Sequence, residues 1–345
     1  MKTTILAGLL LAPGFVIAQP AAAPATAATA RVVARAKEFL AALTESQRTK
    51  VSFQFDDEKQ RTRWSNLPGP MFHREGLRLG DLSATQRSAV MALLSAALSK
   101  PGYEKVLAIM EGDEVLKGDM QQKGGGKQKG GGAFGHDEYY VSILGAPSLS
   151  DPWMLQFGGH HLALNLTIVG SQGVITPSHT AAQPATYTRD GKTVRPLGAE
   201  NDKAFALLHA LDPAQQKQAI LGYRVKDLVL GPGEDGKTIQ PEGIKASTLT
   251  SSQQAMLLGL IGEWAGIVHE AAAAARMAEI KANIADTWFA WSGSTEDGKA
   301  AYFRIQGPTL VIEYAPQGMG GDPTMHIHTI YRDPTNDYGK KWVKR

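Results

Sequence analysis

Two pairs of histidines offer most of the chemistry that this sequence can perform. His326 and His328 lie two positions apart in a run of strand-forming residues, and His160 and His161 are adjacent in a second such run. Because successive side chains of a strand point to opposite faces, residues two apart share a face. We therefore expect both pairs on strands, with His326 and His328 side by side as half of a metal site or as a pair of general bases.

Glu313 is the carboxylate that the pattern places best for completing such a site. In the predicted strand 309–314 it alternates away from Leu310 and Ile312, so it leaves the aliphatic face. A long hairpin connection would put this strand beside that of His326 and His328. Imidazoles and a carboxylate with an open position suit Zn, Mn, Fe(II) or Cu(II). The predicted metal ligands are His326, His328, Glu313, His160 and His161.

The same histidines fit two metal-free interpretations. They could line a polar pocket for a small molecule, or form a structural hydrogen-bond network with Glu313 or Asp333 as acceptor. Arg332 begins an Asp-Pro turn and could bind an anionic substrate. The catalytic candidates are Glu313, His161 and Arg332. The lone histidines are expected to be surface or core residues: His136, His179, His209 and His269.

The first 30 residues predict export. An apolar run follows Lys2 and ends in Val16-Ile17-Ala18, so residues 1–18 are predicted to be a signal peptide that is cleaved after Ala18. Residues 19–30 are almost entirely Ala, Pro and Thr, which is typical of a flexible leader. No stretch reaches the roughly 18 apolar residues of a membrane span. We expect a periplasmic or secreted protein.

Composition narrows the class of partner. The net charge is only +3, which argues against a nucleic-acid binder, and the sequence contains no Cys, which excludes disulfides and thiolate ligands. Motifs for dinucleotides, P-loops, serine hydrolases and zinc proteases do not occur, so no organic cofactor is predicted. The expected partner is a small-molecule ligand or substrate, and the oligomeric state stays open.

Internal repeats determine the predicted organisation. Four segments with Leu and Gln four residues apart, each with a capping residue after the Leu, are typical of helix starts; they begin at Leu43, Leu82, Leu211 and Leu249. The first pair matches the second at an offset of 167–168 residues, which falls to 148 for the later strands. A Gly/Lys-rich segment, 118–135, accounts for the difference and is expected to be a disordered insertion. The chain therefore looks internally duplicated.

The predicted fold class is α+β, with two pseudo-symmetric halves that each contain helices followed by a small antiparallel sheet. We place the first half at 31–184, a linker at 185–194 and the second half at 195–345. The halves should pack as one unit, and a metal site could lie in a cleft between them.

Several runs along the chain resemble one known family. Among them are Gly159-His-His-Leu-x-Leu-Asn165, Gly307-Pro-x-x-x-Ile-Glu-Tyr314 and His326-Ile-His-Thr-Ile-Tyr-Arg-Asp-Pro334. Together they resemble the domain of unknown function 3500 family over nearly all of residues 31–339. The resemblance supports the domain organisation and implies no established reaction.

Two functions therefore stay open. The first is an exported metal-dependent enzyme with a His/Glu site on the C-terminal strands, with hydrolysis favoured over oxidation because no organic cofactor motif is present. The second is a periplasmic protein that binds a small molecule or a metal without catalysis.

Overall fold

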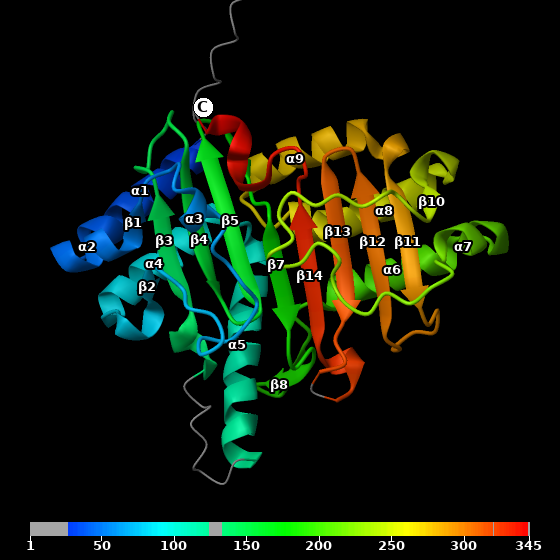
Figure 1. Ribbon diagram of the computed structural model, residues 1–345, viewed down its shortest axis with the longest axis horizontal. Helices are drawn as coiled ribbons and strands as arrows, with labels where there is room; N and C mark the ends of the chain where they lie inside the picture. The colour runs from blue at the N-terminus through cyan, green and yellow to red at the C-terminus, as the bar shows by residue number, and fades with distance from the viewer. Residues whose placement is uncertain (1–26, 124–132, 320, 344–345) are drawn as a thin grey trace, which may run out of the picture.

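A 12-stranded sheet forms the centre of the molecule (Figure 1). The computed structural model describes residues 27–123, 133–319 and 321–343. The strands of this sheet are β1 (Ser52–Phe53), β2 (Leu77–Arg78), β3 (Tyr140–Leu144), β4 (Trp153–Gly159), β5 (Leu162–Val169), β6 (Gln172–Val174), β7 (Ser178–Ala182), β10 (Ile244–Lys245), β11 (Trp288–Gly293), β12 (Ala301–Gly307), β13 (Leu310–Pro316) and β14 (Ile327–Arg332). A separate hairpin joins β8 (Tyr187–Arg189) to β9 (Lys192–Val194).

The strand order is β1-β3-β4-β5-β7-β14-β13-β12-β11-β10, with β2 on β3 and β6 on β5. The fold is therefore mixed α+β, as the sequence predicts. Instead of two small sheets, however, one continuous sheet runs through the molecule, and it is mixed because β1 pairs with β3 in parallel. Strand β7 joins the two parts, since it pairs with β5 on one side and with β14 on the other.

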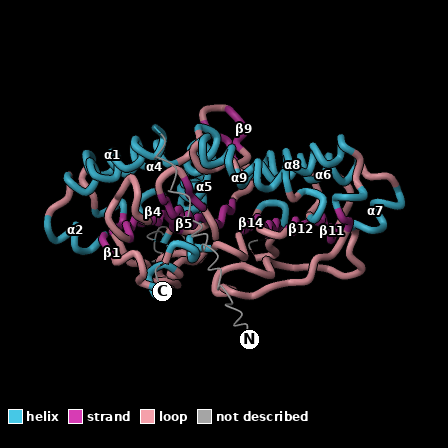
Figure 2. The backbone as a smooth tube through the Cα atoms, turned by 90° about the horizontal axis from the view of Figure 1, so that it is seen from above, coloured by secondary structure: helices cyan, strands magenta, loops and turns pink. Residues whose placement is uncertain are grey.

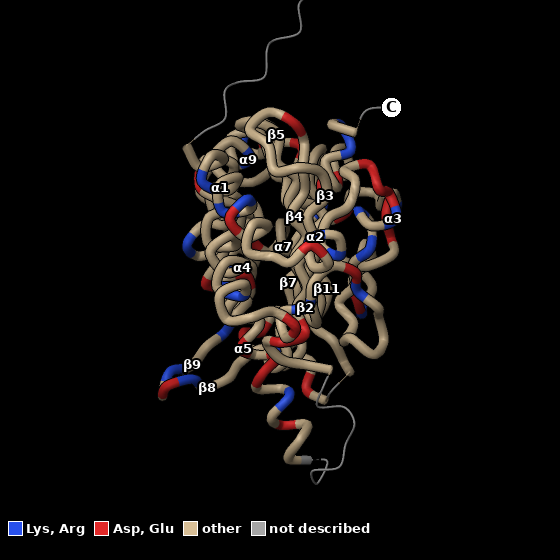
Figure 3. Tube along the Cα trace, turned by 90° about the vertical axis from the view of Figure 1, so that its left-hand side faces the viewer, with Lys and Arg blue, Asp and Glu red and all other residues tan. Residues whose placement is uncertain are grey.

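Most of the helices cover one face of this sheet, whereas loops and the short helix α3 cover the other (Figures 2 and 3). The helices are α1 (Ala27–Ala41), α2 (Glu45–Val51), α3 (Glu58–Arg61), α4 (Ala84–Ala97), α5 (Lys100–Lys123), α6 (Gly198–Ala210), α7 (Pro213–Ala219), α8 (Ser251–Ala265) and α9 (Glu270–Ala282). We call the two sides the helix face and the loop face. The large core cluster lies on the helix face, between α1, α4, α6, α8 and the strands.

Strict alternation in β14 shows how the sequence separates the two faces. Ile327 and Tyr331 belong to the large core on the helix face, whereas Ile330 belongs to a smaller cluster that includes Trp64 from a loop. Because side chains two apart share a face, His328 projects with Ile330 toward the loops. The even-numbered residues of β14, which carry the chemistry, thus all face the loop layer.

Four matched helix starts confirm the local part of the sequence analysis. Helices α2, α4, α7 and α8 all begin with a capping box. In each, a side-chain oxygen of the N-cap residue accepts from the main-chain amide of a glutamine three residues later, and the side chain of that glutamine accepts from the main-chain amide of the N-cap residue. The glutamines also pair with one another: Gln47 bonds to Gln86 and Gln215 bonds to Gln253. The first pair links the starts of α2 and α4, and the second links the starts of α7 and α8.

Two predicted boundaries were wrong. Residues 27–30 of the expected leader already belong to α1, whose buried positions include Thr29, Val32 and Val33. Residues 118–123 of the expected Gly/Lys insertion complete α5. The rest of the signal peptide and leader (1–26) and residues 124–132 of the insertion lie outside the described residues.

Charged residues of both signs are interspersed along the side of the molecule that Figure 3 shows. Among the described residues, the structure contains no helix that is both long and apolar enough to cross a membrane.

Candidate metal centre

Strand β7 brings the two histidine pairs together at the middle of the sheet. His328 of β14 lies opposite Ala181 of β7. On the other edge of β7, the main-chain amide of Ala181 donates to the main-chain oxygen of His161 at 2.9 Å. His161 and His328 therefore flank one residue of β7, although they are separated by more than 160 residues in sequence. The two pairs meet within one continuous sheet and not in a cleft between separate halves.

The second pair does not lie on a strand, contrary to the expectation from the sequence. His160 and His161 form the two-residue turn between β4 and β5, and His161 has a positive φ of 63°. Such a conformation is uncommon for a residue other than glycine and is frequent at functional sites. The turn stacks the two rings, with centroids 3.6 Å apart, and directs them toward the start of β14.

Three imidazole nitrogens converge at this point. The Nε2 atom of His326 lies 3.0 Å from Nε2 of His161 and 3.0 Å from Nε2 of His328. His161, His326 and His328 each contribute one ring nitrogen to a set of possible metal-ligand atoms, and these atoms all lie within 4.8 Å of one another. Nitrogens bound at about 2.0–2.1 Å to one tetrahedral Zn ion lie about 3.3 Å apart, so the spacing suits a shared metal ion.

The surroundings of the three rings favour the neutral form that metal binding requires. Nδ1 of His326 lies 2.8 Å from the main-chain oxygen of Met319, which can only accept, so Nδ1 carries the proton and Nε2 keeps its lone pair. Burial, together with the neighbouring histidines, holds the pKa of His161 and of His328 well below the usual value. Burial also lowers the pKa of His326. Neutral imidazoles are ligands, whereas protonated ones are not.

A carboxylate–histidine pair adjoins this group. Asp113 of α5 lies 2.5 Å from Nδ1 of His160, and its other oxygen accepts from the amide of Gly135 at 2.8 Å. Both side chains are buried. Asp113, His160 and His161 form a second group of ligand atoms within 4.8 Å of one another. The buried His/Asp clusters of this protein could therefore hold a metal ion.

The histidines open into a cavity of about 930 Å³ on the loop face. His160, His161, His326 and His328 all line it. Aromatic and apolar side chains form much of the remaining wall, among them Trp64, Leu67, Phe72, Phe134, Leu228 and Met319. A concave apolar wall with a few convergent polar groups is typical of a small-molecule site.

Comparison with known families assigns the chain to one of them. The profile of DUF3500, described as "Protein of unknown function", matches residues 25–340. The chain belongs to the DUF3500 family. No curated protein and no solved structure matches the chain, so no relative names a function.

Glu313 of this DUF3500 protein lies outside the group of three histidines, although we predicted it as a ligand. Its carboxylate is fully buried and accepts from the amides of Val229 at 2.9 Å and Leu230 at 2.7 Å and from the Tyr302 hydroxyl at 2.6 Å. It does share the loop face with His328, but its strand partner is Ile330. Its contacts hold the 229–230 loop against the sheet.

Arg332, predicted to bind a substrate, is likewise occupied by internal contacts. Its guanidinium donates to the main-chain oxygens of Leu230 and Gly231 at 2.7 and 2.9 Å, and it pairs with Asp235 and Asp337 at 2.8 and 3.0 Å. Only 3% of the side chain is exposed. The arginine therefore holds the same loop as Glu313, and most of its donors are used by partners within the described chain.

Two residues of the site were missed from the sequence. His179 on β7 is fully buried, its ring lies 5.3 Å from that of His328, and neither of its nitrogens has a partner among the described residues. Asp113 was missed because it stands alone in a helix. A signal existed for Asp113, since it continues the buried stripe of Val106, Ile109 and Met110 at helical spacing.

Proposed function

We propose that this protein is an exported metal-dependent enzyme, and that the reaction is a hydrolysis. The observation that carries the proposal is the convergence of His161, His326 and His328 through their Nε2 atoms at the wall of a cavity. Three imidazoles with an open fourth position are a common catalytic zinc set, and imidazole also suits Cu and Fe. Zn, Mn, Fe and Cu therefore all remain candidates, with a small molecule as substrate.

The residues around the three histidines support proton transfer. A bound metal would polarise a substrate oxygen or lower the pKa of a water molecule. His160 is held at Nδ1 by Asp113, so its Nε2 is the nitrogen left to take a proton from that water and pass it to the leaving group. Because oxidation needs no such fixed acid–base pair, the Asp113–His160 pair favours hydrolysis. We expect Asp113→Asn to lower the turnover by about 10²–10⁴-fold while metal binding persists.

A binding protein without catalysis is the second candidate. The large cavity with its aromatic wall favours it, since ligand binding needs the wall but not the metal. In a metal-free protein, Nε2 of His326 has one lone pair and would accept a hydrogen bond from only one of His161 and His328, although both Nε2 atoms lie 3.0 Å away.

Metal analysis of protein purified without a histidine tag tests the metal site on which the enzyme proposal rests, and the turnover of Asp113→Asn then separates catalysis from metal binding alone. The enzyme proposal requires about one metal ion per chain, lost in His326→Ala and His328→Ala. His269→Ala is the matched control, because His269 caps α9 and lies outside the site. Added metal should raise the unfolding free energy by about 2.7 kcal/mol at a hundredfold excess over the dissociation constant. No bound metal, together with no thermal shift for Zn, Mn, Fe or Cu, would refute the metal enzyme and leave the binding protein.

We also propose that residues 1–18 are a signal peptide and that the two halves arose by duplication. The matched capping boxes, and the glutamine pairs 47–86 and 215–253, support the duplication. A superposition of 31–184 on 195–343 in which α2 does not fall on α7 would contradict it. N-terminal sequencing of protein from the periplasm tests the cleavage, which should leave Gln19 first.

A further inference from the structure

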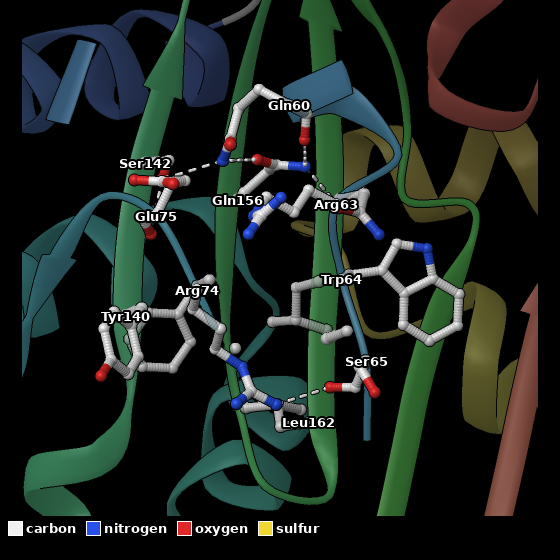
Figure 4. Close-up of a pocket in the computed structure, with 15 residues that line it drawn as sticks. Gln60, Arg63, Trp64, Ser65, Arg74, Glu75, Tyr140, Ser142, Gln156 and Leu162 are labelled. Carbon is white, nitrogen blue, oxygen red and sulfur yellow. Dashed lines mark hydrogen bonds between the residues drawn. The ribbon is translucent and has the colours of Figure 1, made fainter. Parts of the chain in front are cut away.

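A second, smaller cavity lies on the loop face in front of β3, β4 and β5 (Figure 4). It has a volume of about 40 Å³, which is room for about three water molecules or one small oxyanion. Arg63 reaches it from the segment after α3, and Arg74 from the segment before β2. Figure 4 shows both side chains extending into the same hollow, beside Tyr140 and below the hydrogen-bonded pair Gln60 and Gln156.

Both arginines keep donors that nothing in the described chain satisfies. Nε of Arg63 and Nη1 of Arg74 are buried and have no hydrogen-bond partner among the described residues. By contrast, Nη2 of Arg74 is fully used, since it donates to the main-chain oxygens of Ser65, Leu67 and Gly159 at 2.7, 2.6 and 2.8 Å. A buried donor without a partner is costly, and more so on a charged group.

Their charge is also uncompensated. Arg78 pairs with Asp81 and Glu138, whereas Arg63 and Arg74 pair with no carboxylate that the structure describes. Both lie over the ring of Phe72, at 5.7 and 5.3 Å from its centroid. The carboxylate on the cavity wall, Glu75, lies 3.5 Å from His73 and is 44% exposed.

We infer that this cavity binds an oxyanion, a carboxylate or phosphate group, between Arg63 and Arg74. Guanidinium groups match both groups in geometry, and Gln60, Gln156 and Ser142 offer further polar contacts at the wall. Arg63, Trp64 and Ser65 line this cavity and the large one as well. The oxyanion could therefore be a free ion or the anionic group of a molecule that fills the large cavity. The inference does not depend on a metal at the histidines.

Arg63 is the residue to change, because Arg74 also fastens a loop. We would measure the melting temperature of the wild type, Arg63→Gln and Arg87→Gln in inorganic phosphate and in chloride at equal ionic strength. Arg87 pairs with Asp137 away from the cavity and is the matched control. Phosphate stabilises many proteins by exclusion, so the difference between variants is the readout. The wild type and Arg87→Gln should gain about 2 °C or more over Arg63→Gln.

Equal gains in the wild type and Arg63→Gln would overturn the inference. Calorimetric titration of phosphate into each folded protein at 25 °C gives the same answer if the variant melts early. Phenyl phosphate distinguishes the two sources: a larger gain than with phosphate indicates an anionic group of a larger ligand, and an equal gain indicates a free ion. His328→Ala should retain the phosphate effect. Loss of the effect in His328→Ala, with retention in Arg63→Gln, would place the anion at the histidines and overturn the inference.

Discussion

Ala181 lies directly opposite His328 in the β7–β14 ladder, and both side chains are on the loop face. On the other side of β7, the amide of Ala181 donates to the main-chain oxygen of His161. On β7, the residue that lies between these two histidines therefore carries only a methyl group. Because the side chain of Ala181 is small, the Nε2 atoms of His161 and His328 can both approach Nε2 of His326.

Filling this space should prevent metal binding. In Ala181→Leu, the longer side chain would push His161 and His328 apart, and overpacking should lower the unfolding free energy by about 1–3 kcal/mol. Ala181→Gly is the matched control: it keeps the space, should retain the metal, and should cost about 0.5–1 kcal/mol. Metal content by mass spectrometry and denaturant unfolding measure both effects. A metal-loaded Ala181→Leu protein would show that the site lies elsewhere.

The contact between His326 and Met319 gives a second prediction. Deleting Gly318 and Met319 removes the carbonyl that fixes the His326 tautomer, so metal affinity should fall by about 10–100-fold. Met319→Ala should leave the affinity unchanged, because the side chain is 81% exposed and only the main chain takes part. Competition with a chelator of known affinity measures the change. An equal effect in both variants would mean that the side chain, and not the carbonyl, matters.

Glu313→Gln should weaken the fold without affecting the metal. The carboxylate accepts from two amides and one hydroxyl, and an amide side chain would turn a donor toward one of them. We expect a loss of about 1–3 kcal/mol in unfolding free energy, and a smaller loss of about 0.5–1.5 kcal/mol for Tyr302→Phe. Thermal unfolding and metal analysis on the same samples test this. Loss of metal from a folded Glu313→Gln protein would restore Glu313 as a ligand.

His179 should make the protein sensitive to acid. Burial lowers the pKa of His179 from 6.5 to about 3, so between these values the unfolded chain binds a proton that the folded chain does not. The unfolding free energy therefore falls as the pH drops below 6.5. His179→Leu should reduce this slope by about 1.4 kcal/mol per pH unit. Denaturant unfolding at several pH values measures it, and an unchanged slope would show that the pKa of His179 is the same in the folded and the unfolded protein.

Local patterns were enough to predict the helix starts and the faces of the strands. The capping boxes at Thr44, Ser83, Asp212 and Thr250 depend on residues three apart, and all four occur. Alternation likewise put Glu313 on the face of His328. It could not give the register, in which Ala315 and not Glu313 lies opposite His328. A shift of two residues keeps the face but changes which side chains touch.

Other parts of the site depend on contacts between distant segments. The meeting of His161 with His328 requires β7 to insert between β5 and β14, and no short-range pattern specifies such an order. The turn at His160 and His161 was also hidden, because neither residue is typical of a tight turn. The internal partners of Arg332 were not predicted, because the loop that it binds, 230–235, lies about 100 residues earlier in the chain.

The continuous sheet limits how this protein can move. Strand β7 is hydrogen-bonded along both edges, so the left and right parts of Figure 1 cannot swing apart without breaking a ladder in the middle of the sheet. Hinge closure of the kind seen in two-lobed binding proteins is thereby excluded as a way in for a ligand. Entry of a ligand into the large cavity must instead depend on the loop segments that line it, such as 64–72, 227–234 and 317–319. The histidines are held by the continuous sheet, so we expect any movement that admits a ligand to occur in the loop segments over the cavity.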